Sequence, residues 1–167
     1  MRFDEGENKM IWENLNEQLI FPKLDVKSKE EVFEIVGQRF IDLGLCKSDY
    51  VLALKERENS FSTGLQIEHI GVAIPHTDPE HVIKEAISIA TMKQPVTFYH
   101  MGTEDVEVQA QVIMMLAIPG KHHMEVLQSV ILFIQDVDVI EKLLKATDSK
   151  AIIEIIKEKE VNGLENF

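Results

Sequence analysis

The sequence contains a single cysteine, Cys46, among 167 residues. One cysteine excludes an internal disulfide and any zinc or iron–sulfur site that several cysteines would build. Basic residues are also scarce, because 17 lysines and arginines stand against 29 acidic residues and leave a formal net charge of -12. Phosphate backbones are held by clustered lysine and arginine, so the composition argues against a nucleic-acid partner.

No apolar run in the sequence is long enough to span a membrane. The first residues, Met1 to Asn8, are charged and polar and do not resemble the apolar core of a signal peptide. We therefore expect a cytoplasmic protein without direct membrane insertion. The sequence also lacks a glycine-rich phosphate loop followed by lysine, which argues against nucleotide binding. His76 and His81 are five residues apart and do not match the His-Glu-x-x-His zinc pattern. We expect no cofactor.

The chain has the length of one domain, and its 45% of hydrophobic residues can bury a sizeable core. Large apolar residues are sparse near the N-terminus, where we expect a loosely docked start. The sequence predicts a flexible N-terminal lead over residues 1–17, a compact domain over residues 18–160 and a C-terminal tail over residues 161–167.

Predicted strands and helices alternate along the domain. A capping box at Ser28 begins a helix that Gly44 ends. Four more helices are expected. The first is capped by Asp49, the second starts at His122, the third covers residues 137–146, and the fourth is capped by Ser149. Strands are expected at Leu19 to Phe21 before Pro22, at 70–74, at 86–92 with 95–98 continuing the sheet after a turn, and at 112–118.

The run from Val112 to Ile118 is apolar throughout, which is typical of a strand covered on both faces. We expect it to be the central strand. Strands that alternate with helices predict an α/β fold, with a mixed β-sheet sandwiched between helices in a single compact domain.

His76 follows Pro75 at the end of the predicted strand 70–74. An isolated histidine is as often a buried core residue as a functional one. The position of His76 favours function, because α/β folds place their sites along the carboxyl edge of the sheet.

Two more side chains could join His76. His122 and His123 lie in the first turn of the helix beyond the strand 112–118, so His76 and His123 can leave neighbouring strand ends on the same side. For the adjacent His122 we favour a solvent-facing position. Arg57, at a helix end, has an exposed salt bridge as its default interpretation, but an inward guanidinium would suit phosphate.

These residue types are compatible with phosphoryl transfer. A neutral imidazole is a competent nucleophile, and the transfer needs alignment and donors to the equatorial oxygens. His76 as nucleophile with His123 and Arg57 as donors would meet that need. A histidine metal site is a poorer alternative, which would require His76 and His122 or His123 to converge with a carboxylate.

Several motifs together resemble the enzyme IIA domain of the bacterial sugar phosphotransferase system, of the fructose/mannitol type, over roughly residues 18–158. The Thr63-Gly64-Leu65, Pro95-Val96-x-Phe98 and Met101-Gly102 segments most resemble its galactitol-type branch. The residues that carry the family resemblance are Glu56-Arg57-Glu58, Thr63-Gly64-Leu65, Gly71-Val72-Ala73-Ile74-Pro75-His76, Pro95-Val96, Phe98, Met101-Gly102, Val112 to Ala117, His123 and Leu127-Gln128.

The resemblance implies a phosphocarrier that accepts a phosphoryl group from HPr and passes it to a cysteine of enzyme IIB, and through it serves the membrane enzyme IIC. His76 matches the phosphorylated histidine, His123 the second site histidine and Arg57 the arginine of the Glu-Arg-Glu motif. Thr63 and Thr77 are weaker candidates for phosphate contacts. The expected cargo is galactitol-like, with fructose or mannitol next.

Two choices stay open at this point. The doublet His122-His123 allows either histidine as the second site residue, and the following Met124 to Gln128 favours His123. The alternative function is a stand-alone regulatory enzyme IIA-like protein of the nitrogen type, whose phosphorylation controls partner binding.

Overall fold

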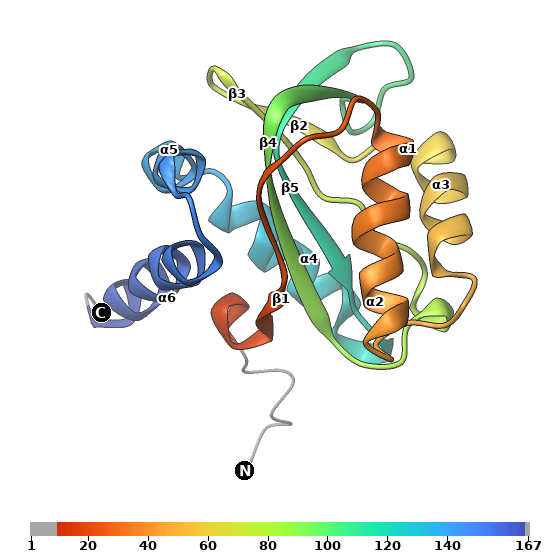
Figure 1. Cartoon of the computed structure of the whole chain (residues 1–167), viewed down its shortest axis with the longest axis horizontal. Coiled ribbons are helices and arrows are strands. Elements are labelled where there is room, and N and C mark those ends of the chain that lie inside the picture. The colour runs from red at the N-terminus through yellow and green to blue at the C-terminus, as the bar shows by residue number, and fades with distance from the viewer. Residues whose placement is uncertain (1–9, 166–167) are drawn as a thin grey trace.

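A computed structural model describes residues 10–165 and contains a five-stranded mixed sheet with helices on both faces (Figure 1). The predicted α/β sandwich is confirmed. The strands are β1 (Leu15–Leu24), β2 (Gly64–Ile67), β3 (Ile70–Ala73), β4 (Ala86–Tyr99) and β5 (Glu107–Ala117), in the order β1-β4-β5-β3-β2.

β5 lies in the middle of the sheet, antiparallel to β4 and parallel to β3. Every residue from Val112 to Ala117 is buried, which confirms the predicted central strand. Of the two edge strands, β1 pairs parallel with β4 and β2 pairs antiparallel with β3. Because β3 and β5 run in the same direction, the segments that follow them leave the same edge of the sheet.

Two layers of helices cover the sheet (Figure 1). The layer on one face contains α1 (Lys29–Val32), the π-helical η2 (Phe33–Gly37), α2 (Gln38–Asp42) and α3 (Tyr50–Ser60), and the other contains α4 (His123–Phe133), α5 (Val137–Lys145) and α6 (Ser149–Glu165). Successive side chains of a strand point to opposite faces. Val112 and Met114 accordingly join the core under α4 to α6, whereas Ile113 and Met115 pack under α1 to α3.

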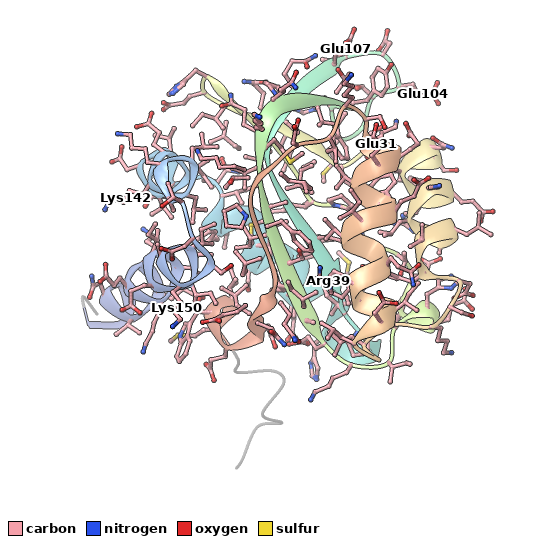
Figure 2. All side chains as sticks on the ribbon, viewed as in Figure 1. Glu31, Arg39, Glu104, Glu107, Lys142 and Lys150 are labelled. Atoms are coloured by element: carbon pink, nitrogen blue, oxygen red, sulfur yellow. The ribbon has the colours of Figure 1, made fainter. Side chains whose placement is uncertain are left out.

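Charged side chains lie outside these two cores. Figure 2 shows Glu104, Glu107, Lys142 and Lys150 at the periphery of the molecule, and all four are exposed. No helix in the described part of the chain combines the length and the apolar character that a membrane crossing requires.

Two strands are longer than the sequence predicts. β1 continues through Pro22 instead of ending there, because an edge strand tolerates a residue that lacks an N–H. β4 is one strand across Pro95, not two segments joined by a turn. Its pairing with β5 is interrupted between Thr91 and Val96, so Pro95 lies where no regular ladder bond is required.

Regular structure extends into the described parts of the expected lead and tail, and the predicted domain bounds stay a prediction. Residues 1–9 and 166–167 lie outside the described part, but Ile11–Asn14 forms the 3-10 helix η1 and α6 extends to Glu165. The carboxylate of Glu160 accepts hydrogen bonds from the backbone N–H groups of Ile11 and Trp12, at 2.9 and 2.7 Å. This contact docks η1 against α6.

Two predicted helix caps are wrong. Asp49 precedes α3 but makes no side-chain cap bond, and its carboxylate lies 3.0 Å from His81 instead. Asp148 rather than Ser149 caps α6, since its carboxylate accepts from the N–H of Ala151 at 2.8 Å. The cap at Ser28 is confirmed, because its hydroxyl accepts from the N–H of Glu31.

Candidate functional site

His76 lies just beyond β3 and forms a parallel bridge with Leu116 at the end of β5. The N–H of Leu116 donates to the carbonyl of Pro75 at 2.9 Å, which fixes this segment against the central strand. His123 begins α4, the first α-helix after β5. The two imidazole rings lie 5.5 Å apart between centroids and are inclined at 58°. The expectation that both histidines leave neighbouring strand ends on one side is confirmed.

The hydrogen bonds of the two rings indicate which nitrogen atoms carry protons. Nδ1 of His76 lies 2.9 Å from the carbonyl oxygen of Ile74, and Nε2 of His123 lies 3.2 Å from that of Thr77. A carbonyl oxygen only accepts, so each of these nitrogens donates an N–H. In neutral His76 the lone pair therefore resides on Nε2, which is the nitrogen available as a nucleophile.

The surroundings of His76 favour that neutral form. The side chain is 7% exposed, and its burial lowers the pKa of His76 below the ordinary histidine value. The nearby His123 and Arg57 lower this pKa further, while the bond to Ile74 and the carboxylate of Asp78 oppose the shift. Burial is the largest of these effects, so the environment favours the neutral form of His76.

Arg57, in the last turn of α3, faces the same region. Its Nη1 lies 2.8 Å from Oδ1 of Asp78, two residues after His76, and its guanidinium lies 4.6 Å from the ring centroid of Phe61. Its Nε is buried and has no hydrogen-bond partner among residues 10–165. The arginine is thus held beside His76 with one donor unused.

An open pocket of about 390 Å³ borders this group of residues. Its lining includes Arg57, Phe61, Thr77 and Asp78. Phe61 is 61% exposed, so the rim combines an apolar ring with charged groups. A phosphoryl group or a partner loop could approach Arg57 from this side without displacing the core.

The hydroxyl groups of the two candidate phosphate contacts are engaged in other hydrogen bonds. Thr63 donates to the carboxylate of Glu58 at 2.7 Å, and Thr77 donates to the carbonyl of Asp78 at 2.9 Å. Both threonines are 2% exposed. Their roles as phosphate contacts stay predictions.

His122 does not face solvent as expected, because its side chain is only 13% exposed. Its Nδ1 lies 3.9 Å from a carboxylate oxygen of Glu125. The ring contact with His76 belongs to His123, which supports His123 as the second site histidine. Within the described residues, no three His, Cys, Asp or Glu side chains gather in a way that could hold a metal ion.

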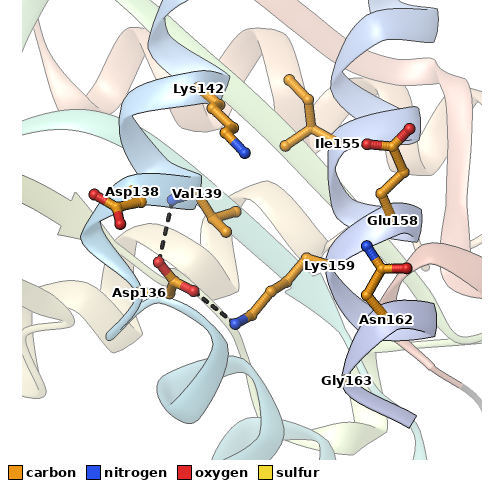
Figure 3. A pocket seen from close by; sticks show the side chains of 9 residues that line it. All are labelled: Asp136, Asp138, Val139, Lys142, Ile155, Glu158, Lys159, Asn162 and Gly163. Atoms are coloured by element: carbon orange, nitrogen blue, oxygen red, sulfur yellow. Dashed lines mark hydrogen bonds and ion pairs between the residues drawn. The ribbon is translucent and has the colours of Figure 1, made fainter. Parts of the chain in front are cut away.

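A second pocket, of about 340 Å³, lies between α5 and α6 (Figure 3). Figure 3 shows the ion pair of Asp136 with Lys159, whose atoms are 2.6 Å apart, and the bond from the N–H of Val139 to the Asp136 carboxylate. No histidine or cysteine lines it, and its lysines are balanced by acids. It therefore offers no histidine or cysteine as a phosphoryl acceptor.

Sequence reasoning missed Asp78 and Glu58. Asp78 gave no signal, because a short carboxylate before Pro79 is usual at a helix start. For Glu58 a signal existed: Tyr50, Leu54 and Glu58 are spaced by four residues, which places them on one face of α3, and all three are buried.

Comparisons with known proteins identify the family. Residues 13–159 match the sequence profile described as "Phosphoenolpyruvate-dependent sugar phosphotransferase system, EIIA 2". The mannitol-specific phosphotransferase enzyme IIA component of Bacillus subtilis is 29% identical over 136 residues, which is 80% of this chain and 89% of that protein. The mannitol-specific EIICBA component of Vibrio cholerae is also 29% identical, over 85% of this chain but only 21% of its own length.

Solved structures agree on the fold. The mannitol enzyme IIA in a complex with phosphorylated enzyme IIB from Escherichia coli superposes with a TM-score of 0.71 at 23% identity, over 85% of this chain and 96% of that one. The nitrogen regulatory protein IIA-Ntr of Neisseria meningitidis gives a TM-score of 0.69 at 24% identity, over 87% and 98% of the two chains. With the profile spanning most of its length, the chain belongs to the EIIA 2 family of the phosphoenolpyruvate-dependent sugar phosphotransferase system.

Proposed function

We propose that this protein is a phosphohistidine carrier that accepts a phosphoryl group on Nε2 of His76. One observation carries the proposal: the Nδ1–H of His76 is tied to the Ile74 carbonyl, which leaves the Nε2 lone pair free in a ring next to His123. Phosphoryl transfer depends mainly on alignment and on donors placed around the transferring group. His123 and Arg57 are the donors nearest to that position.

The transfer step balances without any cofactor. The Nε2 lone pair of His76 forms a bond to phosphorus while the P–N bond of the donor phosphohistidine breaks, and its electron pair stays on the donor nitrogen. A donor ring that was protonated on its other nitrogen thereby becomes neutral, and His76 keeps its proton on Nδ1 against Ile74. Arg57 supplies positive charge near the phosphoryl group.

We infer the partners from the family. HPr is the proposed donor and a cysteine of enzyme IIB the proposed acceptor, with enzyme IIC as the membrane component that IIB serves, so the site of action would be the cytoplasm. The net charge of -12 suits brief encounters with basic protein surfaces. The relatives compared above are mannitol-specific by name, which favours mannitol or a similar polyol as cargo; the galactitol-type resemblance stays a prediction.

Phosphorylation with labelled phosphoenolpyruvate, enzyme I and HPr tests the proposal. The wild-type chain should take up one acid-labile phosphate, and His76→Ala should take up none. His69→Ala is a matched control, because His69 lies at the opposite end of β3 and its side chain is 66% exposed. Label on the His76→Ala protein, or its loss from the His69→Ala protein, would contradict the assignment.

A regulatory role of the nitrogen type is the second candidate. The nitrogen regulatory protein IIA-Ntr of Neisseria meningitidis has the same fold at 24% identity, so the fold is compatible with either role. Adding purified enzyme IIB of the mannitol type to the phosphorylated protein separates the two functions. Rapid transfer of the label to the IIB cysteine supports the transport carrier, whereas label that stays on this chain supports the regulatory alternative.

A further inference from the structure

Glu58 is a buried carboxylate that the phosphoryl-transfer step does not use. It lies near the C-terminal end of α3, next to Arg57, and is only 3% exposed. Both of its oxygens accept hydrogen bonds from one residue: the N–H and the hydroxyl of Thr63, each at 2.7 Å. This two-pronged contact ties the end of α3 to the start of β2.

Two further hydrogen bonds connect this contact to His76. The carbonyl of Thr63 accepts from the N–H of Ile74 at 3.2 Å, and the carbonyl of Ile74 accepts from Nδ1 of His76 at 2.9 Å. The N–H of Ile74 is thus bonded to Thr63, and its carbonyl oxygen fixes the orientation of the His76 ring. An unbroken chain of contacts runs from the carboxylate to the nucleophile.

The segment between these bonds has little room to move. A Cβ atom on Gly64 would lie 2.6 Å from the carbonyl oxygen of Tyr99, so the backbone after Thr63 already touches β4. The carbonyl of Gly64 also accepts from the N–H of Met101 at 2.8 Å. Because this segment is tightly packed, a change at Thr63 cannot be absorbed locally and is passed to Ile74.

Burying the carboxylate of Glu58 in the core costs free energy. Burial raises the pKa of Glu58, and the hydrogen bonds from Thr63 together with the charges of Lys29 and Arg57 oppose that shift. A residue that only filled space here would be apolar, since burying an acid costs free energy unless its oxygens are bonded. An apolar residue could not accept the two hydrogen bonds that the carboxylate of Glu58 accepts from Thr63.

We propose that Glu58 is a positioning residue that acts through Thr63 and Ile74 to hold the strand end and the His76 ring in the orientation that accepts a phosphoryl group. This rests on the proposed role of His76. Glu58 is not among the residues that line the pocket, and its carboxylate is bonded to Thr63, so it would act through its neighbours and not on the reacting atoms.

Three variants of the full chain test this role: Glu58→Ala, Glu58→Gln and Thr63→Val. Glutamine can keep both contacts, because its carbonyl accepts from the Thr63 N–H and its amide donates to the hydroxyl. Alanine removes both contacts and valine removes only the hydroxyl. Asn59→Ala, an exposed neighbour on α3, is the matched control.

The readouts are the ring-nitrogen NMR shifts of His76 in the unphosphorylated protein, which report its tautomer, and kcat and KM for phosphate uptake from phosphorylated HPr. Folding of each variant is checked by circular dichroism. For Glu58→Ala we expect loss of the fixed Nδ1–H tautomer and a fall in kcat of roughly 10- to 100-fold with little change in KM. Thr63→Val should show a smaller loss, and Glu58→Gln should retain the wild-type tautomer and rate.

If Glu58→Ala does not fold, Thr63→Val tests the hydroxyl contact alone by the same readouts. Folded Glu58→Ala or Thr63→Val protein with the wild-type tautomer and kcat would overturn the proposal, and so would a Glu58→Gln variant as impaired as Glu58→Ala. Failure of the proposed function is separate, because it would appear as wild-type protein that takes no phosphate on His76, while the tautomer readout does not depend on phosphorylation.

Discussion

Arg57 and Asp78 form an ion pair at 2.8 Å, so the arginine that interacts with His76 is bound to a carboxylate in the unphosphorylated protein. The side chains of the pair are 31% and 62% exposed. An exposed pair of this kind contributes about 0–1 kcal/mol to stability. We expect the pair to matter for function, because Asp78 and a phosphoryl group on His76 would compete for the same guanidinium.

We predict that Asp78→Asn stabilises the phosphorylated form. Arg57 would lose its competing partner and bind the phosphoryl group, so hydrolysis of the phosphohistidine should slow by about 2- to 5-fold, the factor that a contact of up to about 1 kcal/mol can supply. The half-life of the labelled protein measures this. Asp49→Asn, which removes a carboxylate paired with His81, is the control, and faster hydrolysis in Asp78→Asn would refute the competition.

His123→Ala should separate acceptance of the phosphoryl group from its transfer. The nucleophile remains, so the variant still takes up phosphate, but loss of a donor to the transferring group should slow transfer to enzyme IIB by about 100-fold. Single-turnover transfer of label measures this. His122→Ala provides the comparison, and a larger loss in His122→Ala than in His123→Ala would assign the second site histidine to His122.

The pH dependence follows from the buried position of His76. Because its pKa is lowered, the ring stays neutral as pH falls through the ordinary value of about 6.5, and the rate of phosphate uptake should decline only below that pH. The unfolded chain binds a proton at this histidine at a higher pH than the folded chain does. The free energy of unfolding should therefore decrease as pH falls below about 6.5, with no contribution from His76 above it.

An NMR titration of the His76 ring tests this directly. His69 serves as a comparison in the same spectrum, because its side chain is 66% exposed and lies 3.0 Å from a carboxylate oxygen of Glu141. A midpoint for His76 at or above that of a model histidine peptide would show that burial does not dominate its environment.

The sheet and its helices could be predicted because period-2 and period-3.6 patterns are properties of the local sequence. The apolar run from Val112 to Ala117 identified the central strand for that reason. Pro22 and Pro95 misled the prediction of strand ends, since whether a proline is tolerated depends on edge position and on interrupted pairing, which are set by neighbouring strands.

At the site, the strand ends predicted that His76 and His123 would meet, because parallel neighbours share an edge. The partners of the side chains were not predictable in the same way. Asp78 binds Arg57 from a loop 21 residues further along the chain, and Glu58 binds Thr63 across the end of a helix. Such contacts depend on how the loops close over the sheet, which no local pattern records.

The last prediction concerns Gly71, which belongs to the strand that carries His76. A Cβ atom there would lie 2.1 Å from the carbonyl oxygen of Gln109 in β5, so Gly71→Ala must push β3 away from the central strand. Overpacking of this kind costs about 1–3 kcal/mol. The same displacement would separate His76 from its bridge with Leu116, so phosphate uptake should fall in the folded fraction as well.

Gly163→Ala is the matched control, because a Cβ atom at Gly163 meets nothing within 4 Å. Urea unfolding measures the loss of stability, and phosphate uptake at low denaturant measures the effect on the site. If Gly71→Ala unfolds at the wild-type midpoint, β3 and β5 are packed less closely than the structure indicates. A folded Gly71→Ala protein with normal uptake would instead show that the position of His76 does not depend on this strand contact.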